Sequence, residues 1–497
     1  MYRPRWIMKQ TQSGERKTAV REKEFEKLTQ ALKAQGHDFV ERVIPFHGGT
    51  ISIYFISQMT DRESLAQNVI KPLALFCAAT HESVTARRAA AELIFADEVT
   101  VASNFDHVEA HVLSGMTVLL FSQDKEYLVI NLRMVAHRPV PTPELNFSIR
   151  SPQDCFTENL NTNLSLLRYR LQDKHLKIDY FTVGRRTRTR VAVIYVEDIA
   201  NETIVNQVHY KIQAIDVDGL VSSGELQSFF LDHPYKLFPE MGLIERSDMA
   251  YHVLLDGKVL ILMDGNNNAI YGPKTFSEFF LSCDDRYDSK IFGFFSRVLR
   301  YIALEVALVG TSMYVAVTSY HTDVLPGDYA ILLATLRSST PFTAMIGALL
   351  LEFIMELLRE ALIRVPRHIG PAIGIVGAIV IGQASIAAGI FSSLLLIISA
   401  VSLLCSFAIP DYTLVTPFRI LKFFVILATG TFGFFGFTIA TTAILAMLVS
   451  NTSFGIPFMT PFAPYSKGDF AKAFIDQSHI SKWRLKYLKT KDNKRKQ

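Results

Sequence analysis

Residues 420–449 read ILKFFVILATGTFGFFGFTIATTAILAMLV, with Lys422 as the one charged side chain in the run. A helix that crosses a bilayer needs roughly 20 mostly apolar residues. The run belongs to a series of apolar segments that starts near residue 300 and continues almost to residue 465, which is long enough for several passes. The sequence therefore predicts an integral membrane protein.

The part before residue 296 has a mixed, charged composition and looks soluble. The chain-wide values of 49% hydrophobic residues and a net charge of +4 average over these two unlike parts. Residues 482–497 hold eight Lys or Arg against one Asp, and basic segments close to membrane spans stay in the cytoplasm. No apolar signal-peptide core follows Met1, so we expect the front part to be cytoplasmic as well.

The front part alternates between strand and helix patterns. Residues 50–56 are β-branched and aromatic, residues 61–70 begin with a capping-type Asp, and a hairpin is expected at 117–121 and 127–132. After a Pro-containing linker at 137–143 the pattern restarts. It predicts helices at 158–171 and 201–214, a strand at 190–196, and a hairpin at 258–263 and 269–271. The sequence thus predicts an α/β soluble N-terminal region of two small α/β subdomains, at 25–143 and 144–295, after a basic N-terminal extension at 1–24.

The sequence carries no signature of catalysis or of a cofactor. It lacks a G-x-S-x-G elbow, a G-x-x-x-x-G-K-[ST] phosphate loop, a G-x-G-x-x-G turn and an H-E-x-x-H helix. No two cysteines form a C-x-x-C pair, so neither a metal nor a redox site is indicated, and the thiols are interpreted as buried. These cysteines are Cys77, Cys155, Cys283 and Cys405.

One cluster of arginines allows two interpretations. Residues 185–190 contain Arg185, Arg186, Arg188 and Arg190, a density of positive charge that could hold phosphate or RNA. Because the cluster lies just ahead of a predicted strand, we favour a solvated strand face or a salt bridge at a subunit interface. We therefore expect no nucleic-acid partner.

Within the apolar part, residues 299–320, 394–409 and 420–449 have the composition of membrane spans. Residues 369–389 differ, because they are built from Gly, Ala, Ser and Ile. Small residues let helix backbones approach closely where lipid supplies no hydrophobic drive for association. We expect this segment to pack against protein, including copies of itself, unless it is a glycine-rich span without a special role. Its helix-packing candidates are Gly370, Gly374, Gly377, Gly382 and Gly389.

The helix predicted at 342–364 carries Glu352, Glu356 and Glu360, which recur every four residues and share one face. An Arg three or four residues further on can pair with each of the last two, whereas Glu352 has no such neighbour. A charge at the bilayer centre costs roughly 2.5–3.5 kcal/mol, so this face must meet water, headgroups or protein. In one interpretation it lines a cation pathway shared by several subunits. In the other, only residues 342–351 are immersed and the charged half lies in the cytoplasmic interface.

The charges of the connecting loops predict on which side of the membrane each connection lies. The connection at 320–340 is weakly charged and is placed outside, whereas the next connection is basic and is placed in the cytoplasm. A basic tail on the cytoplasmic side needs a final return, and the break Gly433-Phe434-Phe435-Gly436 offers a place for it. The sequence therefore predicts a C-terminal polytopic α-helical transmembrane domain at 296–466, with four or six crossings, and a basic cytoplasmic tail at 467–497.

Long stretches of the chain resemble one known family. In the apolar part they are LREALIRVPRHIGPAIGIVGAIVIGQASIAAG at 358–389 and SFGIPFMTPFAP at 453–464; in the front part they are FTENLNTNLSLLRYR at 156–170, VGRRTRTRVAVIYVEDIAN at 183–201 and LDGKVLILMDG at 255–265. On these motifs the chain resembles the A-subunit family of GerA-type spore germination receptors, from about residue 25 to residue 466. It departs from the family where Ser247 stands in place of the usual Pro.

The resemblance implies a subunit of a nutrient germinant receptor in the inner membrane of the spore, with the soluble region and the tail in the cytoplasm. The implied partners are a transporter-like B subunit, which senses the nutrient, and a C-subunit lipoprotein. The resemblance further implies that A subunits assemble as an oligomeric, nutrient-gated channel for monovalent cations. The family's soluble region is likewise described as two α/β subdomains.

We expect nutrient binding to a partner subunit to shift the equilibrium between closed and open oligomers, by no more than its differential affinity for the two. The ion-pathway candidates are Glu352, Glu356 and Glu360, together with Gln383 and Ser385 in the small-residue segment. Two alternatives stay open. One is a secondary transporter of a nutrient or ion, which also uses interrupted helices and membrane carboxylates, although the acidic helix is not repeated. The other is a non-conducting scaffold subunit of the receptor.

Overall fold

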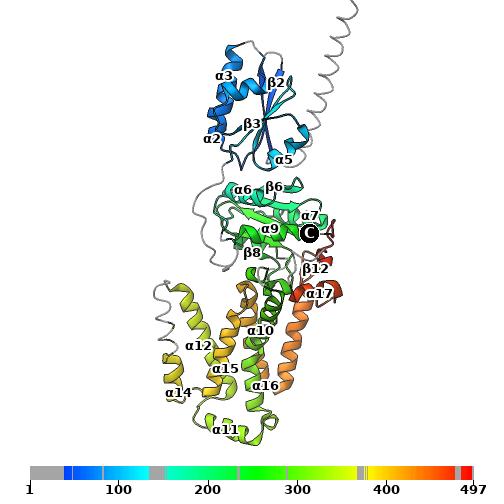
Figure 1. The fold of residues 1–497 in the computed structure, drawn as a ribbon. Helices are drawn as coiled ribbons and strands as arrows, with labels where there is room; N and C mark the ends of the chain where they lie inside the picture. Colours follow the sequence, from blue (N-terminus) through cyan, green and yellow to red (C-terminus); the bar gives the residue numbers. More distant parts are fainter. Residues whose placement is uncertain are drawn as a thin grey trace, which may run out of the picture.

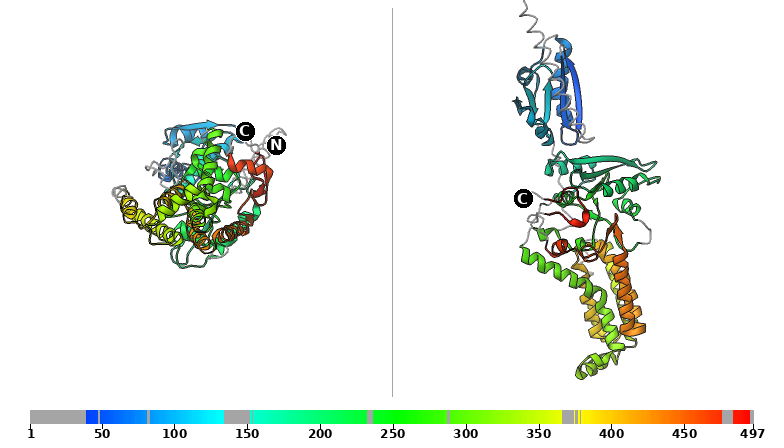
Figure 2. Two further views of the ribbon diagram at one scale, coloured as in Figure 1. Left: turned by 90° about the horizontal axis from the view of Figure 1, so that it is seen from below. Right: turned by 90° about the vertical axis from the view of Figure 1, so that its right-hand side faces the viewer.

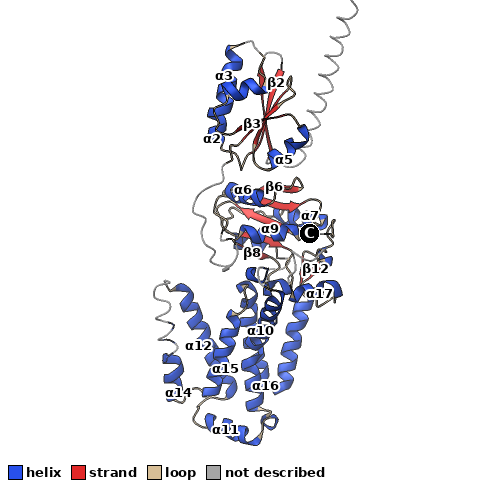
Figure 3. Ribbon diagram, in the orientation of Figure 1, coloured by secondary structure: helices blue, strands red, loops and turns tan. Residues whose placement is uncertain are grey.

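The computed structural model describes residues 39–46, 49–80, 83–133, 152, 154–231, 236–286, 289–365, 374, 377, 379–475 and 483–494. They form two mixed sheet-and-helix units and a bundle of long helices, stacked one below the other (Figures 1 and 3). We call the first unit domain 1 (39–133), the second domain 2 (154–286) and the helices of 290–450 the bundle. The predicted linker at 137–143 and the predicted boundary at 143/144 lie outside the described residues.

Domain 1 is a five-stranded antiparallel sheet covered by helices. Its strands are β1 Phe39–Phe46, β2 Gly49–Ile56, β3 Val99–Ala102, β4 Thr117–Phe121 and β5 Tyr127–Ile130, in the order β1-β2-β4-β5-β3. The covering helices are α2 Arg62–Ser64, η1 Leu65–Ile70, α3 Lys71–Ala79, α4 Ala86–Arg88, η2 Ala89–Leu93, η3 Phe105–His107 and α5 Val108–Leu113. Every residue of β4 and β5 is buried, because η1 and α3 pack on one face of the sheet and α5 on the other. The strand and hairpin predicted at 50–56 and 117–132 are confirmed.

Domain 2 repeats the strand order of domain 1. Its strands are β6 Leu176–Val183, β7 Thr189–Val196, β8 Gly242–Ile244, β9 Val259–Met263 and β10 Ala269–Gly272, in the order β6-β7-β9-β10-β8. Its helices are α6 Leu160–Arg170, α7 Glu202–Gln213, α8 Ser223–Phe229, α9 Ser247–Leu255, η4 Phe276–Phe280 and η5 Cys283–Arg286. In both sheets the first strand in the chain therefore lies at one edge and the third at the other. The predicted helices, strand and hairpin of this region are confirmed.

The two faces of the domain 2 sheet are covered from different parts of the chain. Helices α6 and α9 pack Leu164 and Leu254 on one face. The other face carries α7 together with residues from the far end of the chain, among them Phe454 and Leu488. Leu488 is fully buried there, although it belongs to the segment treated by sequence as a basic tail. The part of that tail around Leu488 is therefore built into domain 2.

The bundle consists of helices that run away from domain 2 and back again (Figure 1). They are α10 Lys290–Ser319, η6 Thr322–Val324, α11 Gly327–Arg337, α12 Ala344–Arg364, η7 Val380–Ala384, α14 Ser385–Ala387, α15 Ser393–Phe407 and α16 Tyr412–Ser450. The chain then forms β11 Thr452–Ser453, β12 Ile456–Pro457, α17 Lys467–Phe474 and η8 Lys486–Leu488 beside domain 2 (Figure 2). Helix α10 begins at Lys290 rather than at the expected 299, because Arg297 and Arg300 both bind Asp285 and hold its first turns against domain 2.

Helix α16 is two antiparallel arms joined at Gly433. Gly433 has φ 64° and ψ −143°, which are not helical values. A straight helix of its 39 residues would be about 58 Å long. Yet residues just beyond both ends contact the same lysine, since Asp411 pairs with the Lys274 side chain and Ser453 accepts a bond from the Lys274 N–H at 3.2 Å. The return expected at Gly433–Gly436 therefore lies at Gly433.

The described helices α10, α12, α15 and the two arms of α16 lie side by side in the bundle, and the described segment 379–387 lies at its edge (Figures 1 and 2). Of the described helices, α10 and α16 are long and apolar enough to cross a membrane by themselves. The outer surface of the bundle is strongly apolar. It exposes Phe353 and Leu357 on α12, Leu404 and Phe407 on α15, and Phe424, Phe432 and Phe435 on α16, each by more than half of its surface.

Candidate functional site

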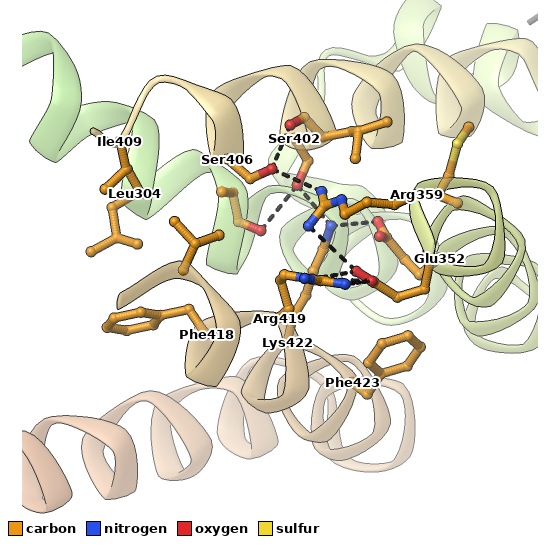
Figure 4. Close-up of a pocket in the computed structure, with 15 residues that line it drawn as sticks. Leu304, Glu352, Arg359, Ser402, Ser406, Ile409, Phe418, Arg419, Lys422 and Phe423 are labelled. Carbon is orange, nitrogen blue, oxygen red and sulfur yellow. Dashed lines mark hydrogen bonds and ion pairs between the residues drawn. The ribbon is translucent and has the colours of Figure 1, made fainter. Parts of the chain in front are cut away.

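A cluster of charged side chains lies inside the bundle, between α10, α12, α15 and α16 (Figure 4). Glu352 of α12 is 8% exposed and forms an ion pair with Lys422 of α16, with 2.6 Å between Oε1 and Nζ. The same carboxylate oxygen accepts a hydrogen bond from Thr311 of α10 at 2.7 Å. Lys422 also donates to Ser402 of α15 at 2.7 Å. All four helices of the site thus meet at one ion pair.

Glu356, one turn further along α12, is held by two arginines. Arg419 of α16 binds it side-on, with 2.8 and 3.0 Å between Nε and the two carboxylate oxygens. Arg359 lies 3.5 Å from the same carboxylate, which confirms the local pair expected from their spacing. Arg359 is 7% exposed, donates to Ser406 of α15 at 2.8 Å, and lies over the ring of Phe407.

The third glutamate does not join this cluster. Glu360 is exposed and pairs with Arg364 at 2.7 Å, as their spacing predicted. The three glutamates of α12 therefore differ in how deeply they lie within the bundle. Its two deeper carboxylates turn into the bundle, and the third lies at the end of the helix. Neither of the two sequence-based interpretations anticipated that the glutamates would be neutralised by cations of a neighbouring helix.

The remaining ion-pathway and packing candidates lie apart from the cluster. Gln383 is exposed and Ser385 half-buried, on the segment that Figure 1 shows beside α12 at the edge of the bundle. A methyl group added at Gly374 or Gly382 would meet no atom within 4 Å, whereas one at Gly377 would contact Leu358. Gly389 has φ +63° and lies against Ser339. Gly370 lies outside the described residues.

The cluster surrounds a small cavity of about 30 Å³. A water molecule needs roughly 10–15 Å³ by this measure, so the cavity has room for about two. The charged residues that line it are Glu352, Glu356, Arg359, Arg419 and Lys422. Such a cavity can hold water or an ion. The charged side chains that line it can also change their ion-pair partners.

A second ionic site joins domain 2 to the bundle. Lys274, which follows β10, is 3% exposed and pairs with Asp411, the N-cap residue of α16. Burial raises the pKa of Asp411, but the charge of Lys274 and its hydrogen bond outweigh this, so that the pKa is lowered overall. For Lys274, burial lowers the pKa, and the Asp411 carboxylate more than reverses the effect. The pair therefore stays charged at neutral pH.

Sequence reasoning missed Arg419 and Lys422 as the partners of Glu356 and Glu352. Lys422 was visible as the lone charge of an apolar run, which is the signal for a buried partner, but nothing in the sequence told which helix carries that partner. In the arginine cluster at 185–190, Arg185 pairs with Asp216 at 2.6 Å and Arg190 with Asp264 at 2.9 Å, and both arginines are exposed, which agrees with the solvated strand face. A salt bridge at a subunit interface stays a prediction. Of the described cysteines, Cys155 is buried, whereas Cys77 and Cys405 are half-buried. The described residues include no cluster of His, Cys, Asp or Glu that could hold a metal ion.

The model of the Bacillus/Clostridium GerA spore germination protein family matches residues 26–486. The chain belongs to the GerA family. The match covers both domains and the bundle, so the family resemblance based on separate motifs is confirmed for nearly the whole length of the chain.

Curated GerA-family relatives share about a third of their residues with this chain. Spore germination protein GerLA of Bacillus cereus is 33% identical over 89% of the chain and 90% of its own length. Spore germination protein B1 of Bacillus subtilis (strain 168) is 34% identical over 82% of the chain and 84% of its own length. The membrane protein YfkQ of the same strain is 30% identical over 88% and 85%. GerLA and B1 are named as spore germination proteins, and membership of this non-enzymatic family agrees with the expectation of no catalysis.

A solved structure matches the front of this GerA-family chain. It is the crystal structure of the N-terminal domain of the A subunit of the Bacillus megaterium spore germinant receptor GerK3. The likeness has a TM-score of 0.36 and 19% sequence identity, and covers 50% of the chain and 94% of that domain.

Proposed function

We propose that this GerA-family chain is the A-type subunit of a nutrient germinant receptor. In this proposal its bundle crosses the inner membrane of the spore six times, with domains 1 and 2 in the cytoplasm. Copies of the chain assemble around a shared axis, together with a transporter-like B subunit and a lipoprotein C subunit, into a nutrient-gated channel for monovalent cations. Opening of the channel starts germination.

The apolar surface of the bundle supports its place in a membrane. In the most apolar 18-residue window of α16, only 22% of the residues are buried by the chain itself. Side chains such as Phe424 and Phe435 would otherwise face water, which is unfavourable for so much contiguous apolar area. Six passes also return the chain to domain 2, so that all the soluble parts lie on one side.

The small-residue segment supports assembly of several copies. Gly374 and Gly382 leave open space next to their backbone in the single chain. Glycine allows close approach of backbones in membrane helices, and among the described residues no atom lies within 4 Å of a methyl group added at either glycine. A second copy is the occupant we propose, which would bring Gln383 and Ser385 of neighbouring copies toward the shared axis.

The role proposed for the glutamates depends on their ion pairs. Glu352 and Glu356 face cations of α16 and not open space, so a permeating cation could contact them only after Lys422 or Arg419 had moved away. Contact between these glutamates and permeating cations stays a prediction. Gln383 is exposed and Ser385 is half-buried, so these two side chains are the stronger candidates for the wall of a cation pathway.

Reconstitution of the full chain into planar bilayers tests the proposal. With a KCl gradient across the bilayer, we expect discrete cation-selective conductance, and native mass spectrometry should show an oligomer. Gly374→Leu and Gly382→Leu should abolish both, while Gly327→Leu, at an equally open glycine outside the segment, should change neither. Solute uptake without conductance would favour a transporter. An intact receptor assembly with neither activity would favour a scaffold.

A further inference from the structure

We infer that the cavity of the charge cluster binds a small monovalent anion of the size of chloride. The site lies within one copy of the chain, and the inference does not depend on whether the assembled protein conducts cations. It rests on the charge of the cavity walls, on a buried donor of a cavity-lining arginine that has no partner among the described residues, and on the size of the cavity.

The charges that line the cavity do not balance. Arg359, Arg419 and Lys422 supply three cations, whereas Glu352 and Glu356 supply two carboxylates, which leaves a net charge of +1. Both carboxylates are already engaged, one by Lys422 and one by Arg419. An uncompensated charge in the interior of a bundle costs several kcal/mol, so a counterion or strongly oriented water is required.

Arg359 carries the excess charge. Its guanidinium is 3.5 Å from Glu356, which Arg419 holds more closely, and its remaining bond is to the neutral hydroxyl of Ser406 at 2.8 Å. Its Nε is buried and, among the described residues, has no hydrogen-bond partner. Buried arginine nitrogens are almost always bonded, so this donor indicates a missing acceptor.

The surroundings suit an anion better than a cation. Arg359 lies over the ring of Phe407, and Met355, Leu304 and Leu403 complete the wall with apolar surface. The cavity volume of about 30 Å³ is enough for one halide with or without a water molecule, and too small for a phosphate group with its four oxygens. A lipid headgroup is likewise excluded by size, and Arg359 is only 7% exposed.

Chloride-35 NMR of the full chain, purified in an uncharged detergent, provides the test. The unmodified chain should broaden the chloride line, and bromide should displace chloride with a saturable dose dependence. In Arg359→Gln we expect the binding to weaken about tenfold or more, because the excess charge is removed. Arg359→Lys, which keeps the charge, should retain binding within a few-fold of the unmodified chain. Arg364→Gln, which removes an exposed arginine outside the cavity, should leave the broadening unchanged.

A second variant should strengthen chloride binding instead of weakening it. It leaves Arg359 in place, so the test does not require that Arg359 can be replaced without loss of folding. Glu356→Gln raises the net charge of the cavity to +2, so chloride should bind about tenfold more tightly. A mere loss of folding could not produce this increase. Absence of saturable broadening in the unmodified chain would overturn the inference in favour of water alone. Equal broadening in the unmodified chain, Arg359→Gln and Glu356→Gln would overturn it in favour of chloride bound elsewhere.

Discussion

Lys274 and Asp411 form an ion pair, with the lysine buried and the carboxylate half-buried, in which a lysine of domain 2 holds the first residue before α16. The backbone N–H of the same lysine donates to Ser453, which follows the second arm of α16. One residue of domain 2 therefore contacts both ends of the α16 hairpin. A displacement of domain 2 therefore reaches the two arms together through Lys274.

Removal of one partner of this ion pair should lower the stability of the folded chain. In Lys274→Met the Asp411 carboxylate stays half-buried without its cation, so we expect the free energy of unfolding to fall by about 3–5 kcal/mol. Thermal unfolding of the purified chain measures the loss. The double variant Lys274→Met/Asp411→Asn should recover part of it, and a double variant as unstable as the sum of the single ones would show that the two side chains do not interact.

The pair also sets a pH dependence. The pKa of Asp411 is lowered in the folded chain, so the stabilisation is fully present above its unfolded value of about 4 and is lost as the pH falls through the lower folded value. Unfolding followed from pH 7 to pH 3 should show stability falling below about pH 4. In Asp411→Asn, the loss of stability that protonation of Asp411 causes should be absent from the pH profile. A profile identical to that of the unmodified chain would contradict the assignment.

Gly433 should not accept a side chain. Its φ of 64° is strained for other residues, and an added methyl group would lie 3.0 Å from His321 and 3.1 Å from Tyr320. We expect Gly433→Ala to lower the free energy of unfolding by about 1–3 kcal/mol, measured by reversible unfolding in mixed micelles. Gly327→Ala, where the added group meets open space, is the matched control and should be close to neutral.

Glu352 and Glu360 should respond differently to the same change. Glu352→Gln leaves Lys422 buried and unpaired, so a loss of about 3–5 kcal/mol in the free energy of unfolding is expected. Glu360→Gln removes an exposed pair and should cost less than about 0.5 kcal/mol. Equal effects in the unfolding assay would mean that Glu352 is not enclosed by the bundle.

Leu488 should matter to domain 2 as much as a residue of its own core. It is fully buried against α7 and the sheet, so Leu488→Ala should destabilise domain 2 by about 2–5 kcal/mol. Limited proteolysis should then cut at sites within 202–213 that resist cleavage in the unmodified chain. Tyr210→Ala, which shortens a side chain that is 74% exposed on the same helix, should leave the cleavage pattern as it was.

Local patterns in the sequence predict the elements of this fold well. Strand β2, the hairpins and helix α6 follow from β-branched runs, turn residues and capping positions, because each of these acts within a few residues. The break at Gly433 was likewise visible, since a basic tail demanded a return and glycine allowed it. Only the family resemblance, and no local pattern, pointed to germination.

Long-range pairings could not be predicted in the same way. Glu352 has no cation within one helical turn, so its partner Lys422 had to come from another helix, and the packing of α12 against α16 decides which one. The identical strand order of the two sheets was also hidden, because strand order is set by pairing between distant segments and leaves no local pattern. The tail was misleading for a related reason. Its many lysines suggest a solvated segment, although Leu488 between them is part of a core.

The position of Leu488 has a consequence for how the protein is made. The ribosome releases residues 483–494 after every helix of the bundle, and until then one face of the domain 2 sheet lacks part of its cover. Domains usually fold in the order in which they emerge, but here domain 2 is completed only when residues 483–494 have been made. Synthesis of the bundle therefore precedes completion of domain 2, and a chain that stops before residue 483 has every described helix of the bundle but an incompletely covered domain 2 sheet.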